Sequence, residues 1–301
     1  MRRSIAHALL AAGIIAHCAA ASADQEHTLF MAITDPAGTP VRDMTADEII
    51  VRWDDDFCEV LDLEPVNWPV RVTVFVDNAT ESEAALPDMR EGLRLFLRRL
   101  PPDIEVAIAT IARRPQFRVQ HTTDRDQLED AIGVIASEGG AATFFDALYE
   151  EAERLDRDRE RQYLPAIVMV AAAGSEGSHK ARPKKLVTMM DRLYENGAVV
   201  YTLLLSSPYG VGHTLGRAQS RWGADLAAST RGRYEQTVVS TRFRKLLPEV
   251  AADLARKHRL TRHQYRVTYR PPEDASDTPR VQVGSTRTGV VVTPTDNGNI
   301  P

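Results

Sequence analysis

Long apolar runs alternate with helical stripes through the middle of this chain. Between the runs, apolar residues recur every three or four positions, as from Leu86 to Leu100, which is the spacing of an amphipathic helix. Uninterrupted apolar runs are typical of strands that are buried on both faces of a sheet. The alternation predicts a doubly wound, mostly parallel α/β sheet flanked by helices. The predicted core strands are 71–77, 104–112, 117–122 at an edge, 165–174, 198–206 and 232–238.

Both ends of the chain have the pattern of strands. Residues 27–35 and 51–66 precede the core, and three further strands, within 263–294, follow it. We therefore expect a small β unit in which N-terminal and C-terminal strands pack together. The expected organisation is an N-terminal β segment at 24–67, the α/β core at 68–260, C-terminal strands at 261–294 and a flexible tail at 295–301.

The first 23 residues have the pattern of an export signal. Arg2 and Arg3 precede an apolar run at 5–21, and the "ASA" at 21–23 is a small-residue cleavage site. We expect cleavage, a mature chain that starts at Asp24, and a periplasmic or secreted location without stable membrane insertion. An uncleaved membrane anchor is the open alternative, although the run is short for a spanning helix.

Composition leaves the predicted fold unchanged, but it narrows the classes of possible partner. Apolar residues make up 43% of the chain and charged residues 26%, which is ordinary for a soluble globular protein. The formal net charge is −5, and loss of Arg2 and Arg3 makes it −7. An acidic chain is a poor generic ligand for nucleic acid or an anionic membrane, so we expect neither partner.

Signal cleavage would also leave Cys58 as the single cysteine, without a partner for an internal disulfide. Its neighbours in "WDDDFCEV" are acidic, and nearby negative charge disfavours the reactive thiolate. We interpret Cys58 as a half-buried strand residue, while a reactive thiol stays open.

Several stretches, in order, resemble one known family. The α/β core resembles the von Willebrand factor type A domain, and about residues 28–294 are similar to bacterial exported "VWFA-related" proteins. The resemblance implies this fold and a protein-binding habit. It is carried by "ITDPAGTPVRDMTADEIIVRWDDD", "EPVNWPVRVTVFVDNATES", "GGAATFFDALYEEAERL", "PAIVMVAAAGSEGS", "LAASTRGRYEQ" and "QYRVTYRP".

The family's metal-ion-dependent adhesion site implies ligand positions in three loops at the carboxyl ends of strands, where open α/β sheets bind ligands. The first loop has Asp-x-Ser-x-Ser in the family, and here the positions hold Asp77, Ala79 and Glu81. The second loop's threonine position holds Ala142, with Thr143 beside it.

The third loop's aspartate position holds Ala173, within Ala172-Ala173-Gly174. Methyl groups therefore replace oxygens in all three loops. Because Mg²⁺ needs several oxygen ligands in near-octahedral geometry, the resemblance implies a degenerate metal site.

We therefore expect an exported, non-enzymatic protein-binding or scaffold module that has no cofactor and binds another protein through its rim loops. The alternative is a metal-dependent adhesion domain with a non-standard Mg²⁺ site at Asp77, Glu81 and Thr143. An enzyme that uses Asp77, Glu81 and His213 as acid–base groups is a third hypothesis. The rim is expected at 77–83, 138–144, 173–180 and 206–216; the glycines of the last loop do not match a phosphate-binding motif.

Overall fold

The structure is a computed structural model that describes residues 15–16, 26–206, 214–273, 276 and 279–300. The chain divides into two compact units. The α/β unit is Pro69–His258, and the β unit combines the described parts of Met1–Trp68 with Arg259–Ile300.

Six described strands form the sheet of the α/β unit, in the order β11-β10-β9-β6-β7-β8. All neighbours are parallel except β7 and β8, so the predicted mostly parallel sheet is confirmed. All ten residues of β9 are buried, which explains its uninterrupted apolar sequence. The strands are β6 Val70–Val76, β7 Glu105–Thr110, β8 Gln116–Thr122, β9 Leu164–Ala173, β10 Val199–Ser206 and β11 Tyr234–Thr237.

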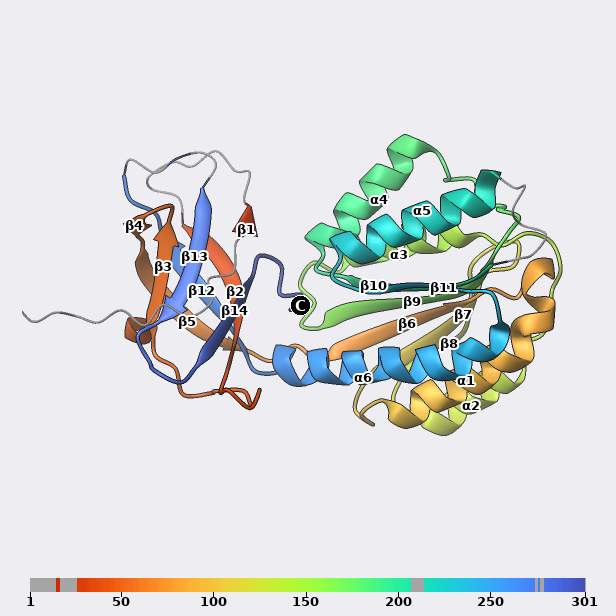
Figure 1. The fold of residues 1–301 in the computed structure, drawn as a ribbon, viewed down its shortest axis with the longest axis horizontal. Helices are drawn as coiled ribbons and strands as arrows, with labels where there is room; N and C mark the ends of the chain where they lie inside the picture. Colours follow the sequence, from red (N-terminus) through yellow and green to blue (C-terminus); the bar gives the residue numbers. More distant parts are fainter. Residues whose placement is uncertain (1–14, 17–25, 207–213, 274–275, 277–278, 301) are drawn as a thin grey trace, which may run out of the picture. The chain divides into compact units, whose positions relative to one another are not determined.

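Helices cover both faces of this sheet (Figure 1). One face packs on α1 (Leu86–Arg99), α2 (Arg125–Gly133) and α6 (Phe243–Thr261). The other face packs on α3 (Phe144–Arg157), α4 (Pro183–Glu195) and α5 (Thr214–Ser229). The helical stripes of the sequence are the buried faces of these helices.

Local chemistry sets several helix ends. The Asp124 side chain accepts hydrogen bonds from the amides of Asp126 and Gln127, and so caps the start of α2. Gly197, with φ of +65°, ends α4 as the Asn-Gly sequence predicts. Gly92 allows α1 and α6 to approach closely, because a Cβ there would lie 2.8 Å from the Phe243 carbonyl oxygen.

Strands from both ends of the chain form the β unit, as expected. The strands described lie in two antiparallel sheets, β1-β13-β3-β4 and β14-β2-β12-β5, around a core that includes Leu29, Val51, Val267 and Val283. Their bounds are β1 Ile15–Ala16, β2 His27–Thr34, β3 Ile49–Trp53, β4 Asp56–Phe57, β5 Glu59–Val66, β12 Gln264–Arg270, β13 Arg280–Ser285 and β14 Val291–Thr295.

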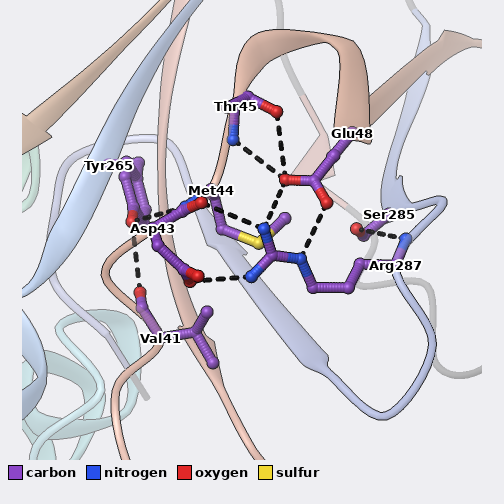
Figure 2. Close-up of polar contacts among 8 residues, drawn as sticks. All are labelled: Val41, Asp43, Met44, Thr45, Glu48, Tyr265, Ser285 and Arg287. Carbon is purple, nitrogen blue, oxygen red and sulfur yellow. Dashed lines mark hydrogen bonds and ion pairs between the residues drawn. The ribbon is translucent and has the colours of Figure 1, made fainter.

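Arg287 joins the loop after β13 to the turn before β3 (Figure 2). Its Nε and a terminal nitrogen donate to the two carboxylate oxygens of Glu48, at 2.7 and 2.6 Å. Its other terminal nitrogen donates to Asp43 Oδ1 at 2.7 Å. Glu48 also accepts from the Thr45 amide at 3.1 Å, as the capping-box spacing predicts. The hydrogen bonds from Arg287 are the main reason that the pKa of Glu48 falls to about 2.

The chain end differs from the expected flexible tail at 295–301. Asn299 and Ile300 are buried, at 2% and 1% exposure. Asn297 Oδ1 accepts from the Asn299 amide at 3.1 Å, and Gly298 has φ of +79°, so the chain turns back after Thr295. A local Asx turn therefore replaces the extended tail.

The predicted signal segment lies largely outside the described residues. Its described pair, Ile15–Ala16, forms β1 and pairs antiparallel with Val281 and Arg280 of β13. Among the described residues, no helix combines the length and apolarity that a membrane span requires.

Candidate functional site

Three predicted rim loops meet at the carboxyl edge of the parallel strands. The Thr80 amide donates to the Gly140 carbonyl at 3.2 Å, which joins the first loop to the second. The Gly177 amide donates to the Ala142 carbonyl at 2.7 Å, which joins the second loop to the third. Of the fourth loop, 206–216, residues 207–213 lie outside the described residues, and so does the candidate acid–base residue His213.

Asp77 lies at the centre of this edge, directly after β6, and is 1% exposed. The Ala79 amide donates to Oδ1 at 2.8 Å. The Ser82 hydroxyl donates to Oδ2 at 2.6 Å, and the Ala172 amide donates to Oδ2 at 3.2 Å. Burial raises the pKa of Asp77, and these three hydrogen bonds oppose that rise only in part. Both carboxylate oxygens therefore have partners within the chain.

Ser82 reaches Asp77 because the residues between them form a 3₁₀ turn, Thr80–Ala85. The Ser82 hydroxyl also accepts from the Ala172 amide at 3.2 Å, so one serine connects the first loop to the end of β9. The resemblance directed attention to positions 79 and 81, and the main hydroxyl partner of Asp77 is neither of them. The only sequence feature that could have indicated Ser82 as a partner of Asp77 is the run of small polar residues after β6.

Glu81, a predicted rim position, lies over Gly174 of the third loop. A Cβ at position 174 would be 2.7 Å from Glu81 Cγ, so glycine is needed there for space. Glu81 Oε1 accepts from the Ser175 amide at 3.1 Å. The side chain thus holds the first loop against the third.

Thr143, the remaining predicted ligand, is 1% exposed and donates from its hydroxyl to the Ile111 carbonyl at 2.8 Å. The methyl side chains of Ala79, Ala142 and Ala173 are buried. Within the described part of the chain, no group of three or more His, Cys, Asp or Glu side chains could hold a metal. The side chains present do not fit a hydrated divalent cation, which needs several converging oxygens.

Asp146, at the start of α3, anchors the third loop. Its Oδ1 accepts from the Lys180 amide at 2.8 Å and its Oδ2 from the His179 amide at 3.0 Å. In return, the Asp146 amide donates to the Ser178 hydroxyl at 2.9 Å. The sequence gives no local signal for this contact, because the loop lies more than thirty positions further along the chain.

Gln219, which is buried on α5, pairs with the half-buried Glu176 of this loop. Gln219, on α5, donates to Glu176 Oε2 at 2.7 Å and accepts from the Gly174 amide at 3.0 Å. Burial is the main cause of a raised pKa at Glu176. No sequence pattern pointed to Gln219, because it lies on a distant helix. Together these contacts make the rim a set of loops tied to one another.

Cys58 belongs to the β unit. It is a free, half-buried cysteine, as expected, but it lies between β4 and β5 and not within a strand. Burial, with Asp56 nearby, raises its pKa to about 11, so the thiolate is scarce at neutral pH.

The α/β unit belongs to the class of open sheet domains whose loops gather at the carboxyl edge of parallel strands. Its particular form is the von Willebrand factor type A fold. A von Willebrand factor type A protein from Catenulispora acidiphila superposes with a TM-score of 0.51 and 9% identity, over 89% of this chain and 72% of its own.

Two bacterial structures also resemble this chain. The BatB protein of Bacteroides thetaiotaomicron covers 62% of this chain and 98% of its own, with a TM-score of 0.46 and 15% identity. An aerotolerance-related membrane protein of Bacteroides fragilis covers 61% of this chain and 99% of its own, with a TM-score of 0.45 and 14% identity. No protein-family model and no curated protein sequence matches the chain significantly. The likeness to the Catenulispora acidiphila protein shows the fold of this chain and no more. A function has to be argued from the residues.

Proposed function

We propose that this chain is an exported, non-enzymatic protein-binding or scaffold module that uses the von Willebrand A fold without a metal ion. The observation that carries the proposal is that both carboxylate oxygens of Asp77 accept hydrogen bonds from the chain itself. The donors are the Ala79 amide, the Ser82 hydroxyl and the Ala172 amide. Such a rim would recognise a partner through shape and polar complementarity.

The proposed contact surface is the solvent side of the three tied loops. Thr80, Glu83, Glu138 and His179 are exposed there. The loops are joined by backbone hydrogen bonds and by Glu81 beneath them, so a partner would meet a preorganised surface and little ordering entropy would be lost.

A metal-dependent adhesion domain remains the alternative, with Mg²⁺ held by Asp77, Glu81 and Thr143. Each of these side chains would first have to leave a partner. Asp77 would leave Ser82, and Glu81 would leave the Ser175 amide. Thr143 donates its hydrogen to Ile111 and would have to present a lone pair toward the ion. These rearrangements make the metal-free form the better-supported proposal.

The export part of the proposal rests on the signal-like first 23 residues. The non-enzymatic part rests on the rim chemistry. Asp77 and Glu81 are engaged within the chain, and the Ser82 hydroxyl that donates to Asp77 is fully buried, so it is shielded from a substrate. A periplasmic or secreted location and a protein partner follow from the two together.

In the test, the mature chain, starting at Asp24, is immobilised as bait. It is then used to capture proteins from the periplasmic or secreted fraction of the source cells. A captured protein is then purified and titrated against the chain by calorimetry, with Mg²⁺ and with EDTA. We expect the same affinity in both conditions. Reversal of the exposed charges Glu83→Lys and Glu138→Lys should weaken binding, and Arg98→Glu on α1 serves as the control. Binding that requires Mg²⁺ would establish the alternative.

A further inference from the structure

A basic segment leads from the third rim loop into α4. The sequence "HKARPKK" at 179–185 places five basic residues in seven positions, in a chain whose formal net charge is −5. The segment begins at the two amides that Asp146 holds, so it is attached directly to the rim.

Most of this charge faces solvent without an acidic neighbour. Arg182, Lys184 and Lys185 are exposed, and none of them makes an ion pair with a described carboxylate. Lys180 is partly covered and lies 3.7 Å from Glu153 and 4.0 Å from Glu150. Three full positive charges are therefore left uncompensated in one place.

These cations do not stabilise the helix that carries them. The first turn of α4 contains no acidic residue, and its N-cap, Arg182, makes no side-chain capping hydrogen bond. Positive charge at a helix N-terminus opposes the helix dipole, and neighbouring lysines repel one another. A role in folding therefore does not account for the cluster.

The surface around the cluster is ordered and partly apolar. The ammonium groups of Lys180 and Lys185 lie 4.6 and 5.6 Å from the centre of the Tyr149 ring. Val187, one turn along α4, is 50% exposed. A ligand at this surface would meet positive charge beside an exposed valine.

We propose that His179–Lys185, together with Val187, is the docking surface for an acidic segment of the partner protein, one that carries carboxylates and an apolar side chain. Carboxylates would pair with Arg182, Lys184 and Lys185, and the apolar side chain would cover Val187. The inference rests on the proposed function, because the segment begins in the third rim loop. A nucleic acid fits the surface less well, since the rest of the chain is acidic.

The test is fluorescence anisotropy with the mature chain and two labelled peptides, one of glutamate and leucine and one of lysine and leucine. We expect saturable binding of the acidic peptide that weakens as salt rises, and no binding of the basic peptide. The double variant Lys184→Glu/Lys185→Glu should bind the acidic peptide at least about tenfold more weakly. Its matched control is Arg98→Glu/Lys245→Glu, which makes the same charge change on α1 and α6 and should bind like the wild type.

The inference is overturned if the acidic peptide does not bind, if the basic peptide binds equally, or if both double variants lose binding alike. Tighter binding of a single-stranded oligonucleotide than of the acidic peptide, abolished by the same lysine substitutions, would assign the surface to nucleic acid instead. The captured partner separates this inference from the proposed function. If the partner binds Lys184→Glu/Lys185→Glu with wild-type affinity, the docking surface is wrong and the proposed protein-binding function stands. If no partner is found, the proposed function itself is contradicted.

Discussion

The Ser82 hydroxyl donates a 2.6 Å hydrogen bond to Oδ2 of Asp77, from within the turn that follows the first core strand. The same hydroxyl accepts from the Ala172 amide, so the serine lies between the carboxylate and the neighbouring strand end. Its position lets the chain itself supply the hydrogen-bond donors that a buried carboxylate needs. In the proposed metal-free module, this contact does the structural work of holding the first and third loops together.

Loss of the Ser82 hydroxyl should destabilise the α/β unit. In Ser82→Ala, Asp77 Oδ2 keeps only the longer bond from Ala172, while the carboxylate stays buried. We expect a loss of about 1–3 kcal/mol in the free energy of unfolding, measured by urea denaturation. Ser137→Ala is the control, because that hydroxyl makes a 3.3 Å contact in an exposed position and should change stability by less than about 0.5 kcal/mol. Equal effects of the two substitutions would contradict the assigned role of Ser82.

The raised pKa of Asp77 predicts a particular pH dependence. Because its pKa in the folded chain is higher than the ordinary aspartate value of 3.8, the folded state holds the proton more tightly. Its contribution to stability is therefore present below pH 3.8 and is lost as pH rises through the folded pKa. Asp77→Asn removes this titration. The stability of the wild type minus that of Asp77→Asn should fall as pH rises from about 4. A difference that increases with pH over this range would show that the carboxylate is favoured in its charged form.

Divalent cations should not change the stability of the mature chain. A ligand that binds only the folded state raises the melting temperature increasingly as its concentration exceeds its Kd, so thermal unfolding with Mg²⁺, Mn²⁺ or EDTA is a direct test. We expect equal melting temperatures and no saturable heat in calorimetry. A saturable stabilisation that Thr143→Ala and Asp77→Asn both remove would identify the alternative Mg²⁺ site.

Arg287 should stabilise the β unit mainly above the pKa of Glu48. Hydrogen bonds, chiefly those from Arg287 with a further contribution from Thr45, lower that pKa from 4.5 to about 2. The stabilising effect of the arginine is therefore complete above pH 4.5 and is lost as pH falls toward 2. Arg287→Met should therefore lower the melting temperature at pH 7 and have a smaller effect near pH 3. The comparison is Arg270→Met, which removes an exposed arginine that pairs with Glu59 and Glu26. We expect that variant to show the weaker dependence on pH.

The periodicity of the sequence predicted the sheet and its helices because burial on two faces leaves a pattern along each element. The sequence also predicted that the rim loops converge, since the carboxyl ends of parallel strands lie at one edge of a sheet. Contacts between distant positions left no such pattern. Arg287 contacts Glu48 across 239 positions of sequence. Gln219 reaches Glu176 of the third loop from helix α5. The resemblance marked Ala79, Ala142 and Ala173 as positions where the family has oxygens, but the contacts that Asp77 makes depended on how a turn directs Ser82.

Asp146 should control the order of the third rim loop and of the basic segment that follows it. An asparagine at this position keeps one acceptor oxygen and places an NH₂ group against an amide N–H, so either the His179 or the Lys180 amide loses its partner. Because a hydrogen bond to a charged group contributes about 1.5–3 kcal/mol, we expect amide exchange at 179–180 to be about tenfold faster or more in Asp146→Asn. Hydrogen exchange with mass spectrometry over 175–185 measures this directly. Glu150→Gln, an exposed neighbour on α3, is the control and should leave the loop protected. Unchanged exchange in Asp146→Asn would mean that the loop is held by Glu176 and Gln219 instead, and the acidic peptide should then still bind that variant with full affinity.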